Sequence, residues 1–328
     1  MRIGCALVLC PAVAALFLSA GCERHDAPAK TPRNAVGQSA ATAPANTGLT
    51  DWVLNPPVVD AERQAACPRL LSAAPNITEI CCALGLGECL VGRTRYCTYP
   101  PSIQAVPSIG ALNDLNAEVL LAIKPDLILI AGNSRAIADR LAALGLKYET
   151  VPDVSLDDLF TAIDRIGTLT GRPQTAARLA IELHADLDKV AARFSNRPKA
   201  RVLVVTAPLA NPPARVDAAG PGSFYDDLLR LAGDTNAAEP SGRAFAPLGL
   251  EFVLRADPDV VIELAPDAGS RPAGDADALR AWSRVGPLRA VARRRVHVLI
   301  GPQYFLLGPR IAQTFEAMCA AIADNDHD

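Results

Sequence analysis

The stretch "LNAEVLLAIKPDLILI" at residues 115–130 decides the fold, because nearly the same pattern returns as "LGLEFVLRADPDVVIE" at residues 248–263. Aligned without a gap, the copies share two leucines, a glutamate, a proline and an aspartate: Leu115/Leu248, Glu118/Glu251, Leu121/Leu254, Pro125/Pro258 and Asp126/Asp259. The separation of roughly 130 residues is far longer than the ~20–50-residue period of a solenoid or propeller. The repeat therefore predicts two lobes that each carry the same structural unit.

The residues of the first copy predict what this unit is. Glu118 opens an apolar segment, and a glutamate in a first helical turn faces the positive end of the helix dipole. Pro125 disfavours helix at Lys124, so the helix is short and ends in a Pro-Asp turn. The following run, 127–130, is wholly apolar, which is typical of a parallel strand covered by helices on both faces. Each half is thus expected to contain a helix, a Pro-Asp turn and a buried strand.

The rest of the body, from about Cys67, alternates predicted strands and helices, which indicates doubly wound parallel sheets. Residues 171–194 carry apolar residues at helical spacing without Gly or Pro after Pro173, and such a helix would run ~30 Å. The expected fold class is α/β, with two Rossmann-like lobes joined by a single long helix. The expected boundaries are an N-terminal lobe at 67–170, a linking helix at 171–197 and a C-terminal lobe at 198–328.

The N-terminus predicts export. Residues 1–21 read as a signal peptide, and the ending "LSAGC" resembles the lipobox of bacterial lipoproteins, which implies lipidation of Cys22. The alternative is an ordinary signal peptide cut near Ala20. Residues 22–66 are rich in Ala, Pro and polar residues and are expected to form a flexible tether. The prediction is a periplasmic lipoprotein that is anchored through Cys22 without crossing the membrane.

Composition excludes some partners and leaves the cysteines open. The formal net charge is −3 and no basic stripe occurs, which argues against nucleic acid. In an oxidising compartment some of the cysteines that follow Cys22 should pair. Cys67 and Cys89 each precede a predicted strand, but the connectivity among Cys67, Cys81, Cys82, Cys89 and Cys97 cannot be read from sequence. Cys319 fits a buried position in the last helix.

No motif predicts catalysis or a resident cofactor. The chain contains no GxSxG, HExxH, Walker A or complete dinucleotide fingerprint. Gly220 and Gly222 are a weak phosphate signal, and Ser223 is better explained as the cap of a helix over 224–231. Cys97 lacks a histidine placed to activate it. The four histidines show no metal-ligand spacing, so we expect no metal site.

Several segments together resemble the periplasmic solute-binding proteins of ATP-binding cassette importers for iron–siderophores, haem and vitamin B12. They are "RLLSAAPNITEICCALGLGECLVGRTRYCTYPP", both copies of the repeat, "GPGSFYDDLLRLAGDTN" and the late "GPRI", and the resemblance covers residues 67–322. It implies a monomeric binding protein, not an enzyme, that captures a metal chelate between its lobes. It also implies that Glu118 and Glu251 dock onto arginines of the permease subunits. The alternative role of these glutamates, complementing a helix dipole, is compatible with docking.

The resemblance also implies cargo-binding residues. Tyr96 matches an aromatic residue that lies on the corrin in B12-binding members, and Phe245 occupies a place where they have tryptophan. Leu112 stands where they carry another tryptophan. These positions imply aromatic and apolar walls for a large flat ligand, and we expect cobalamin as cargo.

Two arginines keep a second cargo open, and a third lies near the expected cleft. Arg93 and Arg95 flank the loop where B12-binding relatives are neutral, and their guanidinium groups would suit the anionic groups of a ferric siderophore or haem. The alternative is ordinary surface charge. Arg310 matches the family's late arginine near the cleft, or it positions the loop. A single rigid linking helix suggests little closure of the lobes on any cargo.

Overall fold

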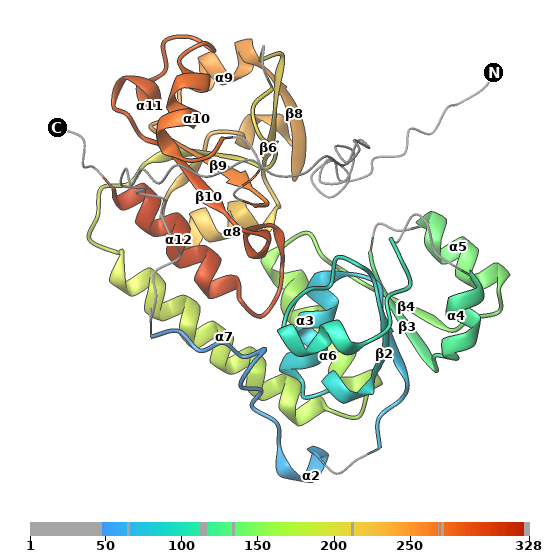
Figure 1. Ribbon diagram of the computed structural model, residues 1–328. Coiled ribbons are helices and arrows are strands. Elements are labelled where there is room, and N and C mark those ends of the chain that lie inside the picture. The colour runs from blue at the N-terminus through green and yellow to red at the C-terminus, as the bar shows by residue number, and fades with distance from the viewer. Residues whose placement is uncertain are drawn as a thin grey trace, which may run out of the picture.

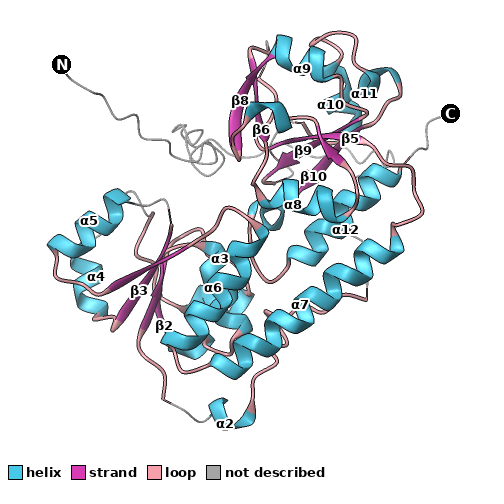
Figure 2. Ribbon diagram, turned by 180° about the vertical axis from the view of Figure 1, so that it is seen from behind, coloured by secondary structure: helices cyan, strands magenta, loops and turns pink. Residues whose placement is uncertain are grey.

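The computed structural model has two β-sheets, each covered by helices on both faces, with one long helix, α7 (Pro173–Arg193), running along both (Figures 1 and 2). The expected α/β class with two lobes and a linking helix is confirmed. The structure describes residues 48–324 apart from 64–65, 112–116, 133–134, 211–212, 268 and 270–271. The predicted signal peptide, Cys22 and the first part of the predicted tether lie outside these residues.

The sheet of the first lobe is wholly parallel, with the strand order β2-β1-β3-β4. Its strands are β1 (Leu70–Ser72), β2 (Leu90–Arg93), β3 (Leu127–Ala131) and β4 (Tyr148–Val151). One face is covered by α3 (Pro75–Ala83) and α6 (Leu156–Leu169), and the other by α4 (Ala117–Ile123) and α5 (Arg135–Ala143). The predicted apolar run 127–130 thus lies in a strand with helices on both faces.

The sheet of the second lobe has the order β10-β9-β5-β6-β8, and β7 pairs with β5. Its strands are β5 (Arg201–Val205), β6 (Arg215–Ala219), β7 (Thr235–Asn236), β8 (Phe245–Gly249), β9 (Val260–Ala265) and β10 (Val296–Ile300). Strand β6 runs antiparallel to both of its neighbours, β5 and β8, which departs from the expected all-parallel sheet. Buried and exposed positions alternate along β8, and Pro247 is exposed, as suits an edge strand with one solvated face.

Helices cover both faces of the second sheet. They are α8 (Phe224–Leu231) and α12 (Ile311–Ala323) on one face, and α9 (Leu250–Ala256), α10 (Asp275–Trp282) and α11 (Arg289–Ala292) on the other. The predicted cap of α8 is confirmed, because the Ser223 side chain accepts a hydrogen bond from the backbone N–H of Asp226. The glycines before Ser223 therefore introduce a helix.

The two copies of the repeat end their helices in the same way. Lys124 follows α4 with φ 49°, and Asp257 follows α9 with φ 41°. Each residue directly precedes the shared proline, where continuing the right-handed helix is unfavourable. The left-handed conformation turns the chain toward the buried strand.

The shared aspartate then fixes this turn to the neighbouring strand. Asp126 Oδ2 accepts the backbone N–H of Arg69 at 2.8 Å, and Asp259 Oδ2 accepts that of Arg201 at 3.0 Å. The backbone N–H groups of the two aspartates donate to the carbonyls of the same arginines, at 2.9 and 2.8 Å. Both lobes therefore place their repeat with the same pair of hydrogen bonds.

One hydrophobic core cluster extends through both lobes. It contains residues from the strands of both sheets, from α3 and α6, from α8 and α12, and from the inner face of α7. Leu179, Leu183 and Leu187 of α7 are at most 2% exposed. Burying a leucine stabilises a fold by about 1.5–3 kcal/mol, so α7 binds both lobes strongly.

The segment 48–63 departs from the expected tether, because it packs on the body. Glu62, in α2 (Asp60–Arg63), accepts hydrogen bonds from the backbone N–H groups of Gln174 and Thr175, at 2.9 and 3.0 Å, and from the Thr175 hydroxyl at 2.6 Å. Arg172, the residue before α7, offers no side-chain cap, so Glu62 caps the linking helix from a distance. Burial opposes ionisation, but these hydrogen bonds outweigh it and lower the pKa of Glu62.

A disulfide joins Cys67 to Cys89, with the Cα atoms 6.0 Å apart. It ties the segment before β1 to the start of β2. Cys81, Cys82, Cys97 and Cys319 are buried free thiols. The structure thereby assigns the pairing that the sequence left open.

Candidate functional site

The loop "RTRYCTYPP" leaves the carboxyl end of β2, where open α/β sheets place their ligand sites. Arg93 braces this loop. Its Nε donates to the carbonyl of Ile103 at 2.9 Å, and its Nη groups donate to the carbonyls of Thr94 and Gln104, both at 3.2 Å. The guanidinium predicted to meet an anionic cargo is thus already engaged with the backbone.

Arg95 and Tyr96 form a pair on the same loop. Arg95 Nη2 donates to the Tyr96 hydroxyl at 2.8 Å, and its guanidinium carbon lies 4.9 Å from the centroid of the Tyr96 ring. Arg95 is exposed and Tyr96 is half-buried. The loop therefore presents an aromatic ring with an adjoining positive charge.

Phe245 comes from the other lobe, at the start of β8, and is half-buried. Its ring meets the ring of the buried Tyr225 edge to face, with centroids 6.4 Å apart, and the Tyr225 hydroxyl donates to the carbonyl of Tyr304 at 2.6 Å. Phe245 is thus supported by a fixed aromatic neighbour. Leu112 lies outside the described residues.

Arg310, at the start of α12, forms an ion pair between the lobes. Its Nε and Nη2 donate to the Glu79 carboxylate of α3 at 3.0 and 2.5 Å, and its guanidinium carbon lies 4.1 Å from the centroid of the Tyr99 ring. The Arg310 and Glu79 side chains are 13% and 2% exposed. Such a bidentate buried pair holds the lobes together, and contact of Arg310 with cargo stays a prediction.

The lobes also meet where α6 and α8 begin. The backbone N–H of Phe224 donates to the carbonyl of Val154, and that of Leu156 donates to Asp227 Oδ2, both at 2.8 Å. Asp153 lies in the same loop, where burial and then the charge of Asp158 raise its pKa to about 6. Sequence reasoning missed this contact, because its partners are far apart along the chain.

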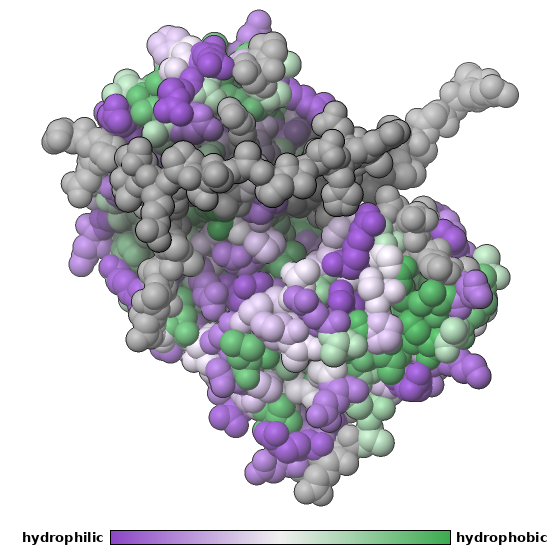
Figure 3. All heavy atoms as spheres, viewed as in Figure 1, coloured by the Kyte–Doolittle hydropathy of each residue, from purple (hydrophilic) through white to green (hydrophobic). Residues whose placement is uncertain are grey.

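The repeated glutamates are exposed in the first turns of α4 and α9. Figure 1 places these two helices in different lobes, each on the side away from α7. Glu118 and Glu251 thus have equivalent places in the two lobes. Near α4 and α5, Figure 3 shows a hydrophobic surface. Leu121 of α4 is 48% exposed.

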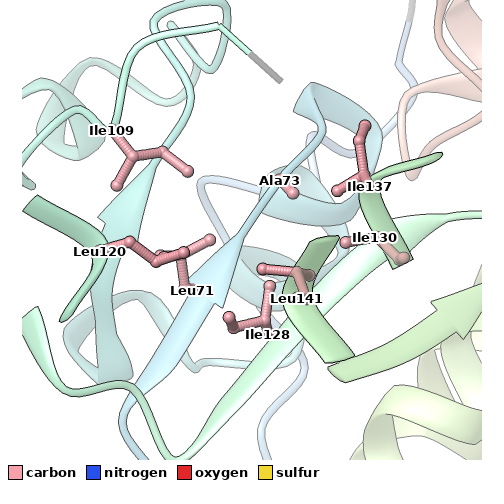
Figure 4. Close-up of a pocket in the computed structure, with 8 residues that line it drawn as sticks. All are labelled: Leu71, Ala73, Ile109, Leu120, Ile128, Ile130, Ile137 and Leu141. Carbon is pink, nitrogen blue, oxygen red and sulfur yellow. The ribbon is translucent and has the colours of Figure 1, made fainter. Parts of the chain in front are cut away.

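A small apolar hollow lies beneath that surface (Figure 4). It is lined by eight aliphatic side chains from β1 and the residue after it, from β3, α4 and α5, and from the loop before α4: Leu71, Ala73, Ile109, Leu120, Ile128, Ile130, Ile137 and Leu141. The side chains pack closely enough to leave no room for a water molecule. The hollow lies on the α4–α5 face of the first sheet, whereas α3 and α6 cover the other face, so we do not assign cargo to it.

The described residues contain no cluster of three or more His, Cys, Asp or Glu that could hold a metal ion. His184 stacks on Phe160 with ring centroids 3.8 Å apart, and His297 Nδ1 lies 3.1 Å from Asp275. Cys97 Sγ lies 3.2 Å from the Thr94 hydroxyl, and burial raises the pKa of its thiol, which disfavours the nucleophilic thiolate.

No helix in the described part of the chain has both the length and the hydrophobicity to span a membrane.

The geometry agrees with comparisons to known proteins. The sequence profile of a family described as periplasmic binding protein matches residues 70–301. A vitamin B12-binding protein of Yersinia pestis (strain Pestoides F) is 27% identical over 201 residues, which cover 60% of this chain and 69% of that protein.

Two solved structures share the fold. A periplasmic haem-binding protein from Roseiflexus sp. RS-1 is 28% identical with a TM-score of 0.66, over 80% of this chain and 100% of that chain. A possible iron-binding, periplasmic solute-binding protein from Staphylococcus epidermidis ATCC 12228 is 25% identical with a TM-score of 0.68, over 79% and 99%. Since the family profile spans most of the chain and the architecture agrees, the chain belongs to the periplasmic binding proteins of ABC importers, which bind solutes and are not enzymes.

Proposed function

We propose that this protein captures cobalamin between its lobes and delivers it to the permease of an ABC importer. The observation that carries the proposal is Tyr96, a half-buried ring on a loop whose backbone is braced by Arg93. Phe245, on the opposite lobe, supplies a second aromatic surface. Rigid aromatic walls suit a large flat ligand, because little conformational entropy is lost on binding.

The state of the arginines supports a corrinoid over an anionic chelate. Arg93 donates to backbone carbonyls and Arg310 to Glu79, so Arg95 is the exposed guanidinium of the three. Binding an anion through Arg310 would require breaking a buried ion pair, which is costly. The similarity to a vitamin B12-binding protein points the same way.

Haem is the second candidate, and the Arg95–Tyr96 pair favours it. A phenol oxygen is a suitable ligand for ferric iron, and the guanidinium 2.8 Å away would stabilise negative charge on that oxygen. The similarity to a haem-binding protein of known structure is consistent with this cargo.

Titration of the purified protein with cyanocobalamin and, separately, with haemin distinguishes the two. For cobalamin we expect saturable binding at micromolar affinity or tighter, weakened about tenfold or more by Tyr96→Ala and by Phe245→Ala. Arg95→Ala should change cobalamin affinity little but should strongly weaken haemin binding. Failure to bind cyanocobalamin by the folded protein would refute the corrinoid proposal.

Delivery and anchoring are parts of the same proposal. Exposed carboxylates at equivalent places on two lobes would match a pair of basic sites on permease subunits. The anchor would be lipid on Cys22, with the protein in the periplasm. Labelling of cells with radioactive palmitate tests the anchor, since Cys22→Ala should abolish incorporation and release the protein from the membrane fraction.

A further inference from the structure

Asp51 belongs to the segment 48–63 that precedes the first strand, yet it contacts the loop "RTRYCTYPP" at residues 93–101. This loop carries Tyr96 and is called the cargo loop below. The Tyr99 hydroxyl donates to Asp51 Oδ2, while Asp51 Oδ1 accepts the backbone N–H of Val53 at 3.1 Å. The Tyr99 ring lies against the guanidinium of Arg310. One carboxylate therefore closes its own turn and also holds the tyrosine that packs on the ion pair between the lobes.

The cargo loop is short between its fixed points. Tyr96 lies three residues before Tyr99, and the loop returns to the lobe through hydrogen bonds from Arg95 N to the carbonyl of Gly110 at 2.9 Å and from Ile109 N to the carbonyl of Arg93 at 2.8 Å. Through Asp51, Tyr99 ties the far half of "RTRYCTYPP" to the N-terminal segment. Freeing its hydroxyl would let the backbone around Tyr96 move.

The electrostatics favour Tyr99 as a lasting donor. Burial, followed by the hydrogen bond and charge of Asp51, raises the pKa of Tyr99, so the phenol keeps its proton throughout the physiological range. A hydrogen bond from a neutral phenol to a carboxylate is charge-assisted and stronger than one between neutral groups.

The segment that carries Asp51 is itself fixed at its other end. Glu62 caps α7, and the backbone N–H of Val59 donates to the Thr175 hydroxyl at 3.0 Å. Val58 lies against Gly85, where an added Cβ would come within 2.4 Å of a Val58 methyl group. Residues 51–62 therefore form a strap that runs from the cargo loop to the start of the linking helix.

We infer that Asp51, acting through Tyr99, is a positioning residue for the cargo site, so that the strap 51–62 is part of the binding machinery. The inference rests on the proposed function, because it takes the loop of Tyr96 as the cargo loop. It assigns a role in binding to a segment that precedes the first strand.

The test compares Tyr99→Phe and Asp51→Asn in the full-length protein. Tyr99→Phe removes the hydroxyl but keeps the ring beneath Arg310, and Asp51→Asn keeps an oxygen for the turn at Val53. We expect each to weaken cyanocobalamin or haemin binding about fivefold to tenfold, mainly through faster dissociation. The double variant should lose no more than the worse single variant, because both remove the same interaction.

Matched controls are Tyr148→Phe, a half-buried tyrosine on β4, and Asp188→Asn, an exposed carboxylate on α7 outside the strap. Both should bind like the parent. Hydrogen–deuterium exchange of residues 93–111 gives a second readout, in which Tyr99→Phe and Asp51→Asn should speed exchange while the thermal midpoint changes little.

The outcomes separate the two claims. Parental affinity and parental exchange in both strap variants would overturn the positioning role. If the parent binds neither cyanocobalamin nor haemin, the proposed cargoes are wrong, and exchange of the loop alone decides whether Asp51 positions it. Faster exchange with unchanged affinity would also refute a role in binding.

Discussion

The two copies of the repeat share a turn but cover different cores. In the first lobe the last residue of the repeat is Ile130 in β3, which lines the apolar hollow beneath α4 and α5. In the second lobe the matching position is Glu263, fully buried, which accepts hydrogen bonds from Trp282 Nε1 and from the backbone of Leu209, both at 2.8 Å. The aspartate turn is common to both lobes, whereas the packing beneath it is particular to each. This difference indicates that the repeat fixes the position of its glutamate rather than a common core.

The largest expected effect tests whether the two repeated glutamates dock the protein onto the permease. Replacing both Glu118 and Glu251 by alanine should abolish cargo uptake by cells while leaving the dissociation constant of the cargo unchanged, because both side chains are exposed on helices away from α7. The control is Glu88→Ala, an exposed glutamate outside the repeat. Unimpaired uptake by the double variant would leave the glutamates with only a helix-dipole role, and unequal single variants would show that one lobe docks more strongly.

The next largest effect is expected on stability, when the ion pair between Glu79 and Arg310 that joins the lobes is broken. Glu79→Ala leaves the guanidinium of Arg310 buried without its carboxylate, and breaking such a pair costs about 3–5 kcal/mol. Chemical denaturation should show this loss in the free energy of unfolding. Arg178→Ala, which removes a mostly exposed partner of Glu182, should cost less than about 0.5 kcal/mol. Equal effects of the two substitutions would contradict a structural role for the pair between the lobes.

A smaller effect is expected in the free energy of unfolding when the aspartate of each Pro-Asp turn is replaced. Asp259 accepts the backbone N–H of Arg201 and also pairs with Arg289 at 2.8 Å, whereas Asp126 accepts the backbone N–H of Arg69 in an exposed position. We expect Asp259→Ala to lower the free energy of unfolding by about 2 kcal/mol and Asp126→Ala by about 1 kcal/mol. Thermal and urea unfolding of the two variants would measure the difference. The reverse order would show that the turn of the first lobe depends more on its aspartate.

The smallest effect is a pH dependence present in one turn. Hydrogen bonds from the Arg289 backbone and side chain, together with its charge, lower the pKa of Asp257, while the matching residue of the first lobe is Lys124. A lowered folded-state pKa adds stability above the unfolded pKa near 4, and this stability is lost as the pH falls through the folded value. Asp257→Asn should therefore reduce stability at pH 7, and the difference from the parent should shrink as the pH falls below the unfolded pKa near 4. Urea midpoints measured from pH 7 to pH 3 would show it, and parallel curves would contradict it.

Local signals predicted the elements well. The linking helix was expected over 171–194 and forms over Pro173–Arg193, because Pro173 suits a first turn and no Gly or Pro interrupts the helix. The helix after Ser223 and the turns before Pro125 and Pro258 are also set by nearby residues. Short-range chemistry determines such features, so a single sequence is sufficient to read them.

Long-range partners were beyond this reading. Glu62 is 113 residues from Thr175 in sequence, and Glu79 is 231 residues from Arg310. A polar, proline-rich segment before the first strand has the composition of a flexible tether. Its packing on the body depends on hydrogen bonds from its carboxylates to residues distant in sequence, which composition does not predict. Arg93 shows the same limit, because an arginine beside a cleft looks free until the carbonyls of Ile103 and Gln104 come near it.

The core cluster that passes through both lobes limits how lobes can be exchanged between related proteins during evolution. Because α7 carries side chains of the core cluster that runs through both lobes, neither lobe is an interchangeable module. A chimera that takes one lobe from a relative would retain a mismatched face on this helix, with cavities or overpacking along the seam. New cargo preferences are therefore expected to arise by substitution within the loops at the strand ends, while the lobes are exchanged only as a pair.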